Sequence, residues 1–250
     1  MRYSLSIVWF LGLLVCWAPS GWTQSPRASL QPSPAQGGDP LSYDVQNPLS
    51  ANPHTPILIA LHGAGSTGKK MGRLVKRLMR LPLRVVLPNA PFPTRRGHSW
   101  YQIRRASSDS DAGFSVARLV DLLETLRHRW PEAPSPYLVG YSQGAVIALR
   151  LTAEHPQLVS GTIALAGYLV PDNLTVLPAS LGAPGLFLAN GRRDRTIPFQ
   201  EGREAAAAFR VQGYEVLFVP HGAGHGCPRA IWKAASRWLK GEIHGFSTSL

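Results

Sequence analysis

The stretch Tyr137-Leu-Val-Gly-Tyr-Ser-Gln-Gly-Ala-Val146 places a serine between two glycines, directly after an apolar run and directly before a run of helix formers. Gly-x-Ser-x-Gly alone is a modest signal, because glycine and serine are common residues. Between a strand and a helix, however, it is typical of a nucleophile elbow, in which a tight turn exposes the serine hydroxyl above a sheet. The sequence therefore makes Ser142 the candidate nucleophile. The amide N–H of Gln143, at the helix start, becomes a candidate donor to an oxyanion.

Short apolar runs alternate with amphipathic segments on both sides of this stretch. Runs this apolar are typical of parallel strands that are buried on both faces. We expect strands over residues 57–61, 84–87, 137–139, 161–165, 185–188 and 215–219. We expect helices over residues 69–80, 112–129, 143–154, 200–212 and 228–240. This alternation predicts an α/β fold: a single domain with a mostly parallel central sheet flanked by helices.

An acid and a base follow Ser142 in the order that such a fold requires. A serine hydroxyl needs an adjacent base, and the base needs an orienting acid. Asp194 stands in a turn after the fifth expected strand, and His225 stands between two glycines after the last one. Asp172, after the fourth strand, is the rival acid, and His221 is the rival base. The positions favour Asp194 and His225, because His225 lies deeper in the glycine loop and reaches further toward the elbow.

A second oxyanion donor is expected where the first core strand ends. The segment Leu61-His-Gly-Ala-Gly65 passes from the strand into small residues, as a loop that carries an oxyanion-hole amide should. We assign this amide to Ala64. An ordinary glycine turn is the alternative interpretation, and the acid and base candidates downstream make it the weaker one.

The first twenty residues have the pattern of a secretory signal peptide. Arg2 precedes a short apolar core from Leu5 to Ala18, and small residues follow. The core is too short for a comfortable membrane span. We therefore expect export to the periplasm or the extracellular space, with cleavage near residue 20.

The rest of the chain divides into three parts. Residues 21–55 are crowded with Pro, Ser, Gly and Gln, which predicts a linker or an irregular lead-in, with a short strand possible near residues 41–45. Residues 56–241 form the expected domain, and residues 242–250 the expected tail. Once the leader is removed, Cys227 is the single cysteine and has no partner for an internal disulfide; we expect it to be half-buried and inert.

The chain is strongly basic, with a formal net charge of +12. This charge suggests contact with anionic surfaces or substrates, but the basic residues are scattered along the chain, which favours a merely soluble basic surface. No zinc spacing, phosphate-binding glycine loop or RNA-binding signature accompanies them, so no specific nucleic-acid partner is predicted. Four arginines flank an aromatic pair and form either a basic rim or a solvated face, the second being favoured: Arg95, Arg96, Arg104 and Arg105.

Taken together, these residues resemble the phospholipase/carboxylesterase family of the α/β-hydrolase superfamily, which includes acyl-protein thioesterases. The similarity runs from about Pro56 to Leu239. The motifs that carry it are Leu61-His-Gly-Ala-Gly65, Val86-Leu-Pro-Asn-Ala-Pro91, Ser99-Trp-Tyr101, Gly140-Tyr-Ser-Gln-Gly144, Ala166-Gly-Tyr-Leu169, Gly191-Arg-Arg-Asp194 with Pro198, and Gly224-His-Gly226.

The resemblance implies a role for each candidate residue and no metal or organic cofactor. The implied roles are nucleophile for Ser142, acid for Asp194, base for His225, and oxyanion hole for the amides of Ala64 and Gln143. By the family pattern Trp100 and Tyr101 line the acyl pocket, although an aromatic pair is as often part of a core.

Three positions depart from the family pattern. Ala64 stands where many members carry a bulkier residue, Asn190 where histidine is common, and Gln102 where aspartate often follows the aromatic pair. Two of these changes would reshape the acyl groove, so the substrate does not carry over from the family. The leader also sets this chain apart from the cytosolic members. Dienelactone hydrolases use cysteine at the elbow, and Ser142 argues against that branch.

We expect an exported serine carboxylesterase that cleaves small-molecule or lipid esters through an acyl-enzyme intermediate. Other enzymatic interpretations are a thioesterase, a lysophospholipase, an esterase of polyesters or acylated polysaccharides, and an acyltransferase. A catalytically silent module that binds polyanions through its basic surface is the alternative from another class.

Overall fold

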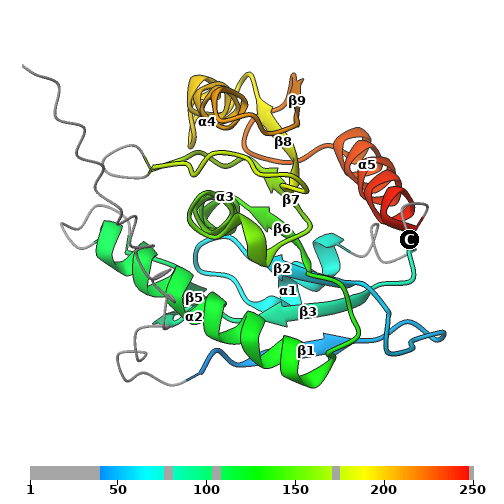
Figure 1. The fold of residues 1–250 in the computed structure, drawn as a ribbon. Helices are drawn as coiled ribbons and strands as arrows, with labels where there is room; N and C mark the ends of the chain where they lie inside the picture. Colours follow the sequence, from blue (N-terminus) through cyan, green and yellow to red (C-terminus); the bar gives the residue numbers. More distant parts are fainter. Residues whose placement is uncertain (1–39, 76–80, 103–107, 171–174, 248–250) are drawn as a thin grey trace, which may run out of the picture. The chain divides into compact units, whose positions relative to one another are not determined.

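The computed structural model describes residues 40–75, 81–102, 108–170 and 175–247. Its centre is a seven-stranded sheet in the order β1-β3-β2-β6-β7-β8-β9 (Figure 1). The strands are β1 (Tyr43–Gln46), β2 (Ile57–Leu61), β3 (Arg84–Pro88), β6 (Tyr137–Tyr141), β7 (Gly161–Leu165), β8 (Gly185–Gly191) and β9 (Val216–His221). Within this sheet only β1 runs antiparallel to its neighbour. The predicted mostly parallel sheet is confirmed.

In the described residues, five α-helices cover the two faces of this sheet. They are α1 (Gly68–Val75), α2 (Ser108–Arg129), α3 (Gln143–Glu154), α4 (Phe199–Val211) and α5 (Arg229–Ser247). Helices α2, α3 and α4 lie on one face, whereas α1 and α5 lie on the other (Figure 1). The structure is therefore a doubly wound α/β fold, as the alternation of strands and helices predicts.

Strand β2 shows why the sheet strands are apolar throughout. Side chains alternate between the two faces of a strand. Ile57, Ile59 and Leu61 pack in the cluster that includes α2 and α3, whereas Leu58 and Ala60 pack in the cluster that includes α1 and α5. All five are buried. A strand with helices on both faces has no polar side, so no alternation of polar and apolar residues appears in its sequence.

The structure changes the expected domain limits at both ends. Tyr43 and Val45 in β1 are half-buried on the edge of the sheet, so the expected linker or lead-in before Pro56 contributes a strand close to the one considered possible at residues 41–45. Helix α5 continues to Ser247, beyond the expected start of the tail. The domain therefore occupies more of the chain than residues 56–241.

A short antiparallel hairpin was not predicted. It consists of β4 (Phe92–Thr94) and β5 (Gly97–Ser99) and follows β3. Its strands have three residues each and include proline and glycine, so they lack the apolar run that marks a strand. The isolated bridge between Ser66 and His98 joins the hairpin to the loop after β2.

The expected signal peptide, residues 1–20, lies outside the described residues. Within the part of the chain that is described, no helix has both the length and the hydropathy needed to cross a bilayer.

Candidate active site

Ser142 forms a sharp turn between β6 and α3. Its φ is 54° and its ψ is −122°. Residues other than glycine rarely adopt a backbone conformation with such a positive φ. The Ser142 N–H donates to the carbonyl of Leu165 in β7 at 2.9 Å, and the Ser142 carbonyl accepts from the N–H of Ala145 at 2.8 Å. These bonds hold the turn by both of its ends. The strand–turn–helix geometry is that of a nucleophile elbow.

The two glycines of the elbow allow the backbones on either side to come close. A methyl group at Gly140 would lie 2.3 Å from the carbonyl oxygen of Gly144, and a methyl group at Gly144 would lie 2.3 Å from that of Leu61. Both contacts are with backbone atoms, which cannot rotate away. Any larger residue would push α3 away from β6 or from β2.

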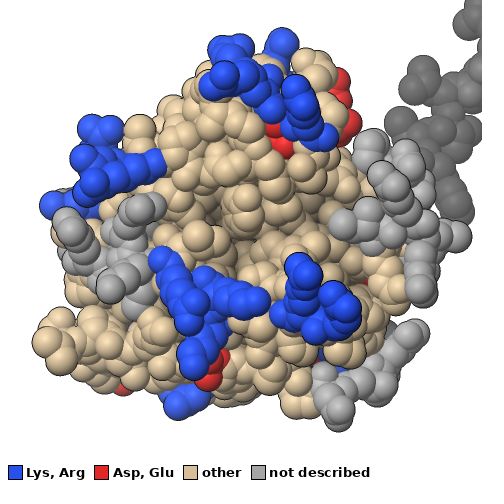
Figure 2. Space-filling view, turned by 180° about the vertical axis from the view of Figure 1, so that it is seen from behind, with Lys and Arg blue, Asp and Glu red and all other residues tan. Residues whose placement is uncertain are grey.

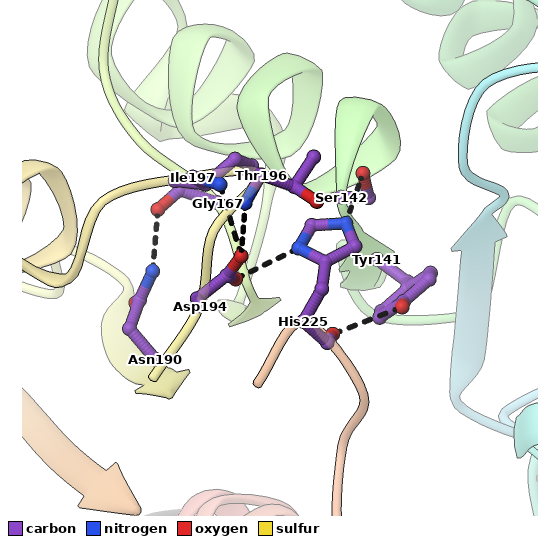
Figure 3. A network of polar contacts seen from close by, with 8 residues as sticks. All are labelled: Tyr141, Ser142, Gly167, Asn190, Asp194, Thr196, Ile197 and His225. Atoms are coloured by element: carbon purple, nitrogen blue, oxygen red, sulfur yellow. Dashed lines mark hydrogen bonds and ion pairs between the residues drawn. The ribbon is translucent and has the colours of Figure 1, made fainter. Parts of the chain in front are cut away.

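Ser142, His225 and Asp194 form one chain of hydrogen bonds (Figure 3). The Oγ of Ser142 lies 2.9 Å from Nε2 of His225, and Nδ1 of His225 lies 2.7 Å from Oδ2 of Asp194. An ionised carboxylate only accepts hydrogen bonds, so Nδ1 of His225 carries the hydrogen. Nε2 is then free to accept the hydroxyl hydrogen of Ser142.

The carboxylate of Asp194 is fixed before any ligand arrives. Its side chain has no exposed surface. Its Oδ1 accepts the N–H groups of Thr196 at 2.8 Å and Ile197 at 3.0 Å, while Oδ2 faces His225 (Figure 3). Because both oxygens have partners, the carboxylate holds the imidazole in one orientation.

The rival base, His221, does not take part in this chain of hydrogen bonds. His221 has its Nδ1 buried without a hydrogen-bond partner among the described residues, and its ring makes no hydrogen bond to Ser142 there. Burial lowers the pKa of His221, partly opposed by the charge of Asp194. Asp172 lies outside the described residues.

The loop after β2, which carries Ala64, lies directly against the elbow. A methyl group at Gly63 would lie 3.4 Å from Cβ of Ser142. The Gly63 carbonyl accepts hydrogen bonds from Nδ1 of His62 at 2.8 Å and from the N–H of Ser66 at 3.2 Å. In a trans peptide, the Ala64 N–H points away from that carbonyl. The two bonds therefore fix the direction of the Ala64 N–H without using it.

His62 is a buried, neutral support for this loop. It is 1% exposed, and its Nε2 accepts the N–H of Ala90 at 3.1 Å. Nδ1 must then carry the hydrogen that is donated to Gly63. Burial lowers the pKa of His62 from 6.5 to about 4, against the opposing effect of its bond to the Gly63 carbonyl. The neutral ring can donate and accept at once, and its protonated form cannot accept from Ala90.

Gln143 contributes its side chain as well as its amide. As the first residue of α3, it has an N–H without an acceptor inside the helix. Its buried side chain accepts the N–H of Trp100 at 2.8 Å through Oε1 and donates to the carbonyl of Tyr101 at 2.6 Å through Nε2. No motif in the sequence predicted this link, and only the polarity of a residue at a buried helix start indicated it.

The aromatic pair splits into a core residue and a residue beside a hollow. Trp100 has no exposed surface, and its indole N–H donates to the His62 carbonyl at 2.8 Å. Trp100 therefore supports the loop after β2 from the interior. It is a core residue rather than part of the lining of an acyl pocket. Tyr101 lies at a hollow of about 260 Å³. The other residues around this hollow are Phe92, Pro93, Thr94, Ser99 and Gln102.

A second hollow is bordered by a tyrosine whose hydroxyl contacts that of Tyr101. The hydroxyl groups of Tyr101 and Tyr168 are 3.4 Å apart. Tyr168 in turn borders a hollow of about 240 Å³ together with Thr196, Ile197, Pro198 and Glu201. Each of the two tyrosines therefore borders one small open space.

One face of the protein is hollowed near its centre and carries several separate groups of Lys and Arg around the hollow, with few Asp and Glu (Figure 2). Arg95 and Arg96, two of the four arginines of the expected rim, are exposed in the turn of the β4–β5 hairpin. Arg104 and Arg105 lie outside the described residues.

Residues 44–240 match the phospholipase/carboxylesterase family. The chain belongs to this family. Esterase YpfH of Escherichia coli is 26% identical over 221 residues, which cover 83% of this chain and 92% of the relative. Acyl-protein thioesterase 1 of Kluyveromyces lactis is 28% identical over 179 residues, which cover 64% of this chain and 78% of the relative.

Solved structures agree with this assignment at the level of the fold. A carboxylesterase from Bacillus cereus superposes with a TM-score of 0.71 at 16% identity, over 81% of this chain and 94% of the other. The predicted resemblance and the predicted fold are confirmed. The family and its relatives make this protein a hydrolase of the carboxylesterase and thioesterase group.

The departure at Asn190 is accommodated by a close neighbour. Asn190 is 1% exposed and donates through Nδ2 to the Gly167 carbonyl at 3.0 Å (Figure 3). A methyl group at Gly202 in α4 would lie 2.3 Å from Cγ of Asn190. The space behind this family position is thus closed by α4.

Cys227 is half-buried, as expected, and packs against the cluster that includes α1 and α5.

The neutral state of His62 predicts a loss of stability in mild acid. Above pH 6.5 the ring is neutral in both the folded and the unfolded chain. As the pH falls from 6.5 to about 4, the unfolded chain binds the proton and the folded one does not. His62 should therefore lower the free energy of unfolding by about 3 kcal/mol across this range.

The measurement is urea unfolding at a series of pH values between 4 and 8. We expect His62→Asn, which keeps a donor near Nδ1 but does not titrate, to be less stable at pH 8 and to lose less stability in acid. His128→Asn, at an exposed position of α2, is the control. An equally steep pH dependence in His62→Asn would contradict the assignment.

Proposed function

We propose that this protein is a serine hydrolase that cleaves carboxylic esters through an acyl-enzyme intermediate. The hydrogen-bonded chain from Ser142 through His225 to Asp194 carries the proposal. It is supported by the strained elbow, which exposes the nucleophile, and by membership of a family of esterases and thioesterases.

In the proposed reaction, Nε2 of His225 takes the proton of Ser142 as Oγ attacks the ester carbonyl carbon. The imidazolium then gives that proton to the leaving alkoxide, and the acyl group stays on Oγ. Water then enters, and its oxygen attacks the acyl carbon as Nε2 of His225 takes one of its protons. The bond to Oγ breaks, the carboxylic acid leaves, and the imidazolium returns that proton to Oγ of Ser142. Asp194 remains ionised throughout and stabilises the charged imidazolium.

The negative charge of each tetrahedral intermediate is assigned to the amides of Ala64 and Gln143. The Gln143 N–H stands at the start of α3, where the helix dipole favours an anion. The direction of the Ala64 N–H is fixed through the Gly63 carbonyl by His62 and Ser66. One donor of this kind typically contributes about a hundredfold or more in rate.

The two hollows beside Tyr101 and Tyr168 favour small esters. Each is an open space of about 240 to 260 Å³ rather than a long tunnel. The acyl group and the alcohol can then occupy one hollow each. Thioesters fit the same chemistry, and the similarity to acyl-protein thioesterase 1 makes them the first alternative to compare.

We also propose that the protein is exported and that residues 1–20 are removed. The apolar core between Leu5 and Ala18 supports this proposal. Mass spectrometry of the protein from a secreting bacterial host should find a mature N terminus near Gly21 outside the cytoplasm. Full-length protein retained in the cytoplasm would contradict it.

The nucleophile is tested by Ser142→Ala. We expect it to lower kcat for a series of nitrophenyl esters, from acetate to palmitate, at least about a thousandfold, because no other group replaces Oγ. The variant should also resist labelling by a fluorophosphonate while keeping its melting temperature. Near-normal turnover by the purified, folded variant would exclude Ser142 as the nucleophile.

Tyr141 is proposed as a positioning residue for the base. It precedes Ser142, and its hydroxyl donates to the His225 carbonyl at 3.0 Å (Figure 3). The two rings lie 5.5 Å apart between centroids. The elbow and the base loop are thus joined by a bond that does not touch the substrate.

Tyr141→Phe removes this hydroxyl alone. We expect kcat to fall about threefold to tenfold with KM unchanged, because a hydrogen bond of this kind contributes about 1 kcal/mol. Tyr214→Phe is the matched control, because its hydroxyl also donates to a backbone carbonyl, that of Leu177, at 3.0 Å. Equal effects of the two variants on kcat would show that Tyr141 acts only on stability.

A further inference from the structure

A hollow of about 420 Å³ lies between α4 and the ends of β8 and β9. Three arginines border it: Arg192, which follows β8, and Arg203 and Arg210 on α4. The remaining residues around it are Phe199, Ala207, Phe218 and Pro220. No carboxylate is among the residues that border this space. We call it the arginine hollow.

Two of these arginines are held in place without a ligand. The guanidinium carbon of Arg192 lies 4.9 Å from the centroid of the Phe199 ring, and that ring packs against Phe218 at 5.7 Å. Nη2 of Arg210 donates to the Val216 carbonyl at 2.8 Å. Side chains fixed in this way lose less entropy when they bind an anion.

The nearest acidic residues along α4 do not neutralise the arginine hollow. Glu201 borders the separate hollow beside Tyr168, and Glu204 accepts a hydrogen bond from Gln200 at 2.9 Å. Within the described residues, no ion pair joins Arg192, Arg203 or Arg210 to a carboxylate.

Arg150, which lies in α3 on the same face of the sheet, differs from these three arginines because it is paired with carboxylates. It pairs with Asp109 at 2.6 Å and with Glu154 at 2.8 Å. The chain thus has the means to pair its arginines internally, and it does so on α3 but not around the arginine hollow.

We propose that the arginine hollow binds a ligand that carries two or more phosphate groups. A guanidinium presents several N–H donors in a plane and can bind a phosphate through two of them at once. Three such groups around one open space provide more positive charge than a single phosphate neutralises. Phe199 and Phe218 add apolar surface to the border of this space, against which the body of the ligand can pack.

The arginine hollow adjoins the loop that carries His225. The N–H of Arg193, the residue after Arg192, donates to the Ala223 carbonyl at 3.2 Å, and its side chain donates to the Gly222 carbonyl. A bound polyphosphate would therefore sit beside this loop. The binding itself does not depend on the proposed esterase activity, so it can be tested without turnover.

The test is calorimetric titration of the mature protein with tripolyphosphate at low salt. We expect saturable binding of one equivalent that weakens as salt is added, because the charges are exposed and screened. Arg203→Ala should raise Kd at least about fivefold, since it removes one charge-assisted contact of roughly 1 kcal/mol.

Matched variants distinguish binding at the arginine hollow from a general effect of the protein's positive charge. Arg237→Ala, at an exposed position of α5 on the opposite face of the sheet, should leave Kd within about twofold, since it removes the same net charge elsewhere. Equal losses in Arg203→Ala and Arg237→Ala, or no saturable binding, would overturn the proposal. Binding of orthophosphate as tight as that of tripolyphosphate would also overturn it, because the site would then hold one anion only.

Discussion

The left-handed backbone of Ser142 is the constraint on which the rest of the site depends. A side-chain-bearing residue in such a conformation costs about 1–3 kcal/mol and persists only where its surroundings enforce it. Here β7 binds the Ser142 N–H, the first turn of α3 binds its carbonyl, and Gly140 and Gly144 let three backbones meet. The strain therefore resides where three backbones approach closely, and it fixes the hydroxyl above the strand ends.

The groups around this hydroxyl are held by buried polar contacts from two sides. On one side, His62 and Gln143 tie the loop after β2 and the Trp100 segment to the elbow. On the other side, Asp194 and Tyr141 hold the base loop. Buried hydrogen bonds of this kind are costly to break, because the separated groups find no water. The elements of the proposed catalytic site are thus held by one another before substrate binds.

The sequence predicted the large features because their causes are local. Apolar runs marked the core strands, and the carboxyl ends of parallel strands share one edge, which brought Ser142, Asp194 and His225 together from distant positions. No comparable sequence pattern predicted the β4–β5 hairpin or the burial of Trp100. Both depend on contacts with the loop after β2, and no periodicity in a single segment encodes contacts between segments.

The basic residues near the site and the proposed oxyanion donors have different physical roles. Three arginines surround Asp194 in the sequence, yet its carboxylate is hydrogen-bonded by backbone N–H groups and by His225. Exposed guanidinium groups are screened by water and salt, so they add little to the stabilisation of a charge that forms at the ester carbonyl. Amides that are fixed at the elbow are not screened in this way. A field of exposed arginines favours anionic molecules over neutral ones, which is the basis of the ligand proposed for the arginine hollow.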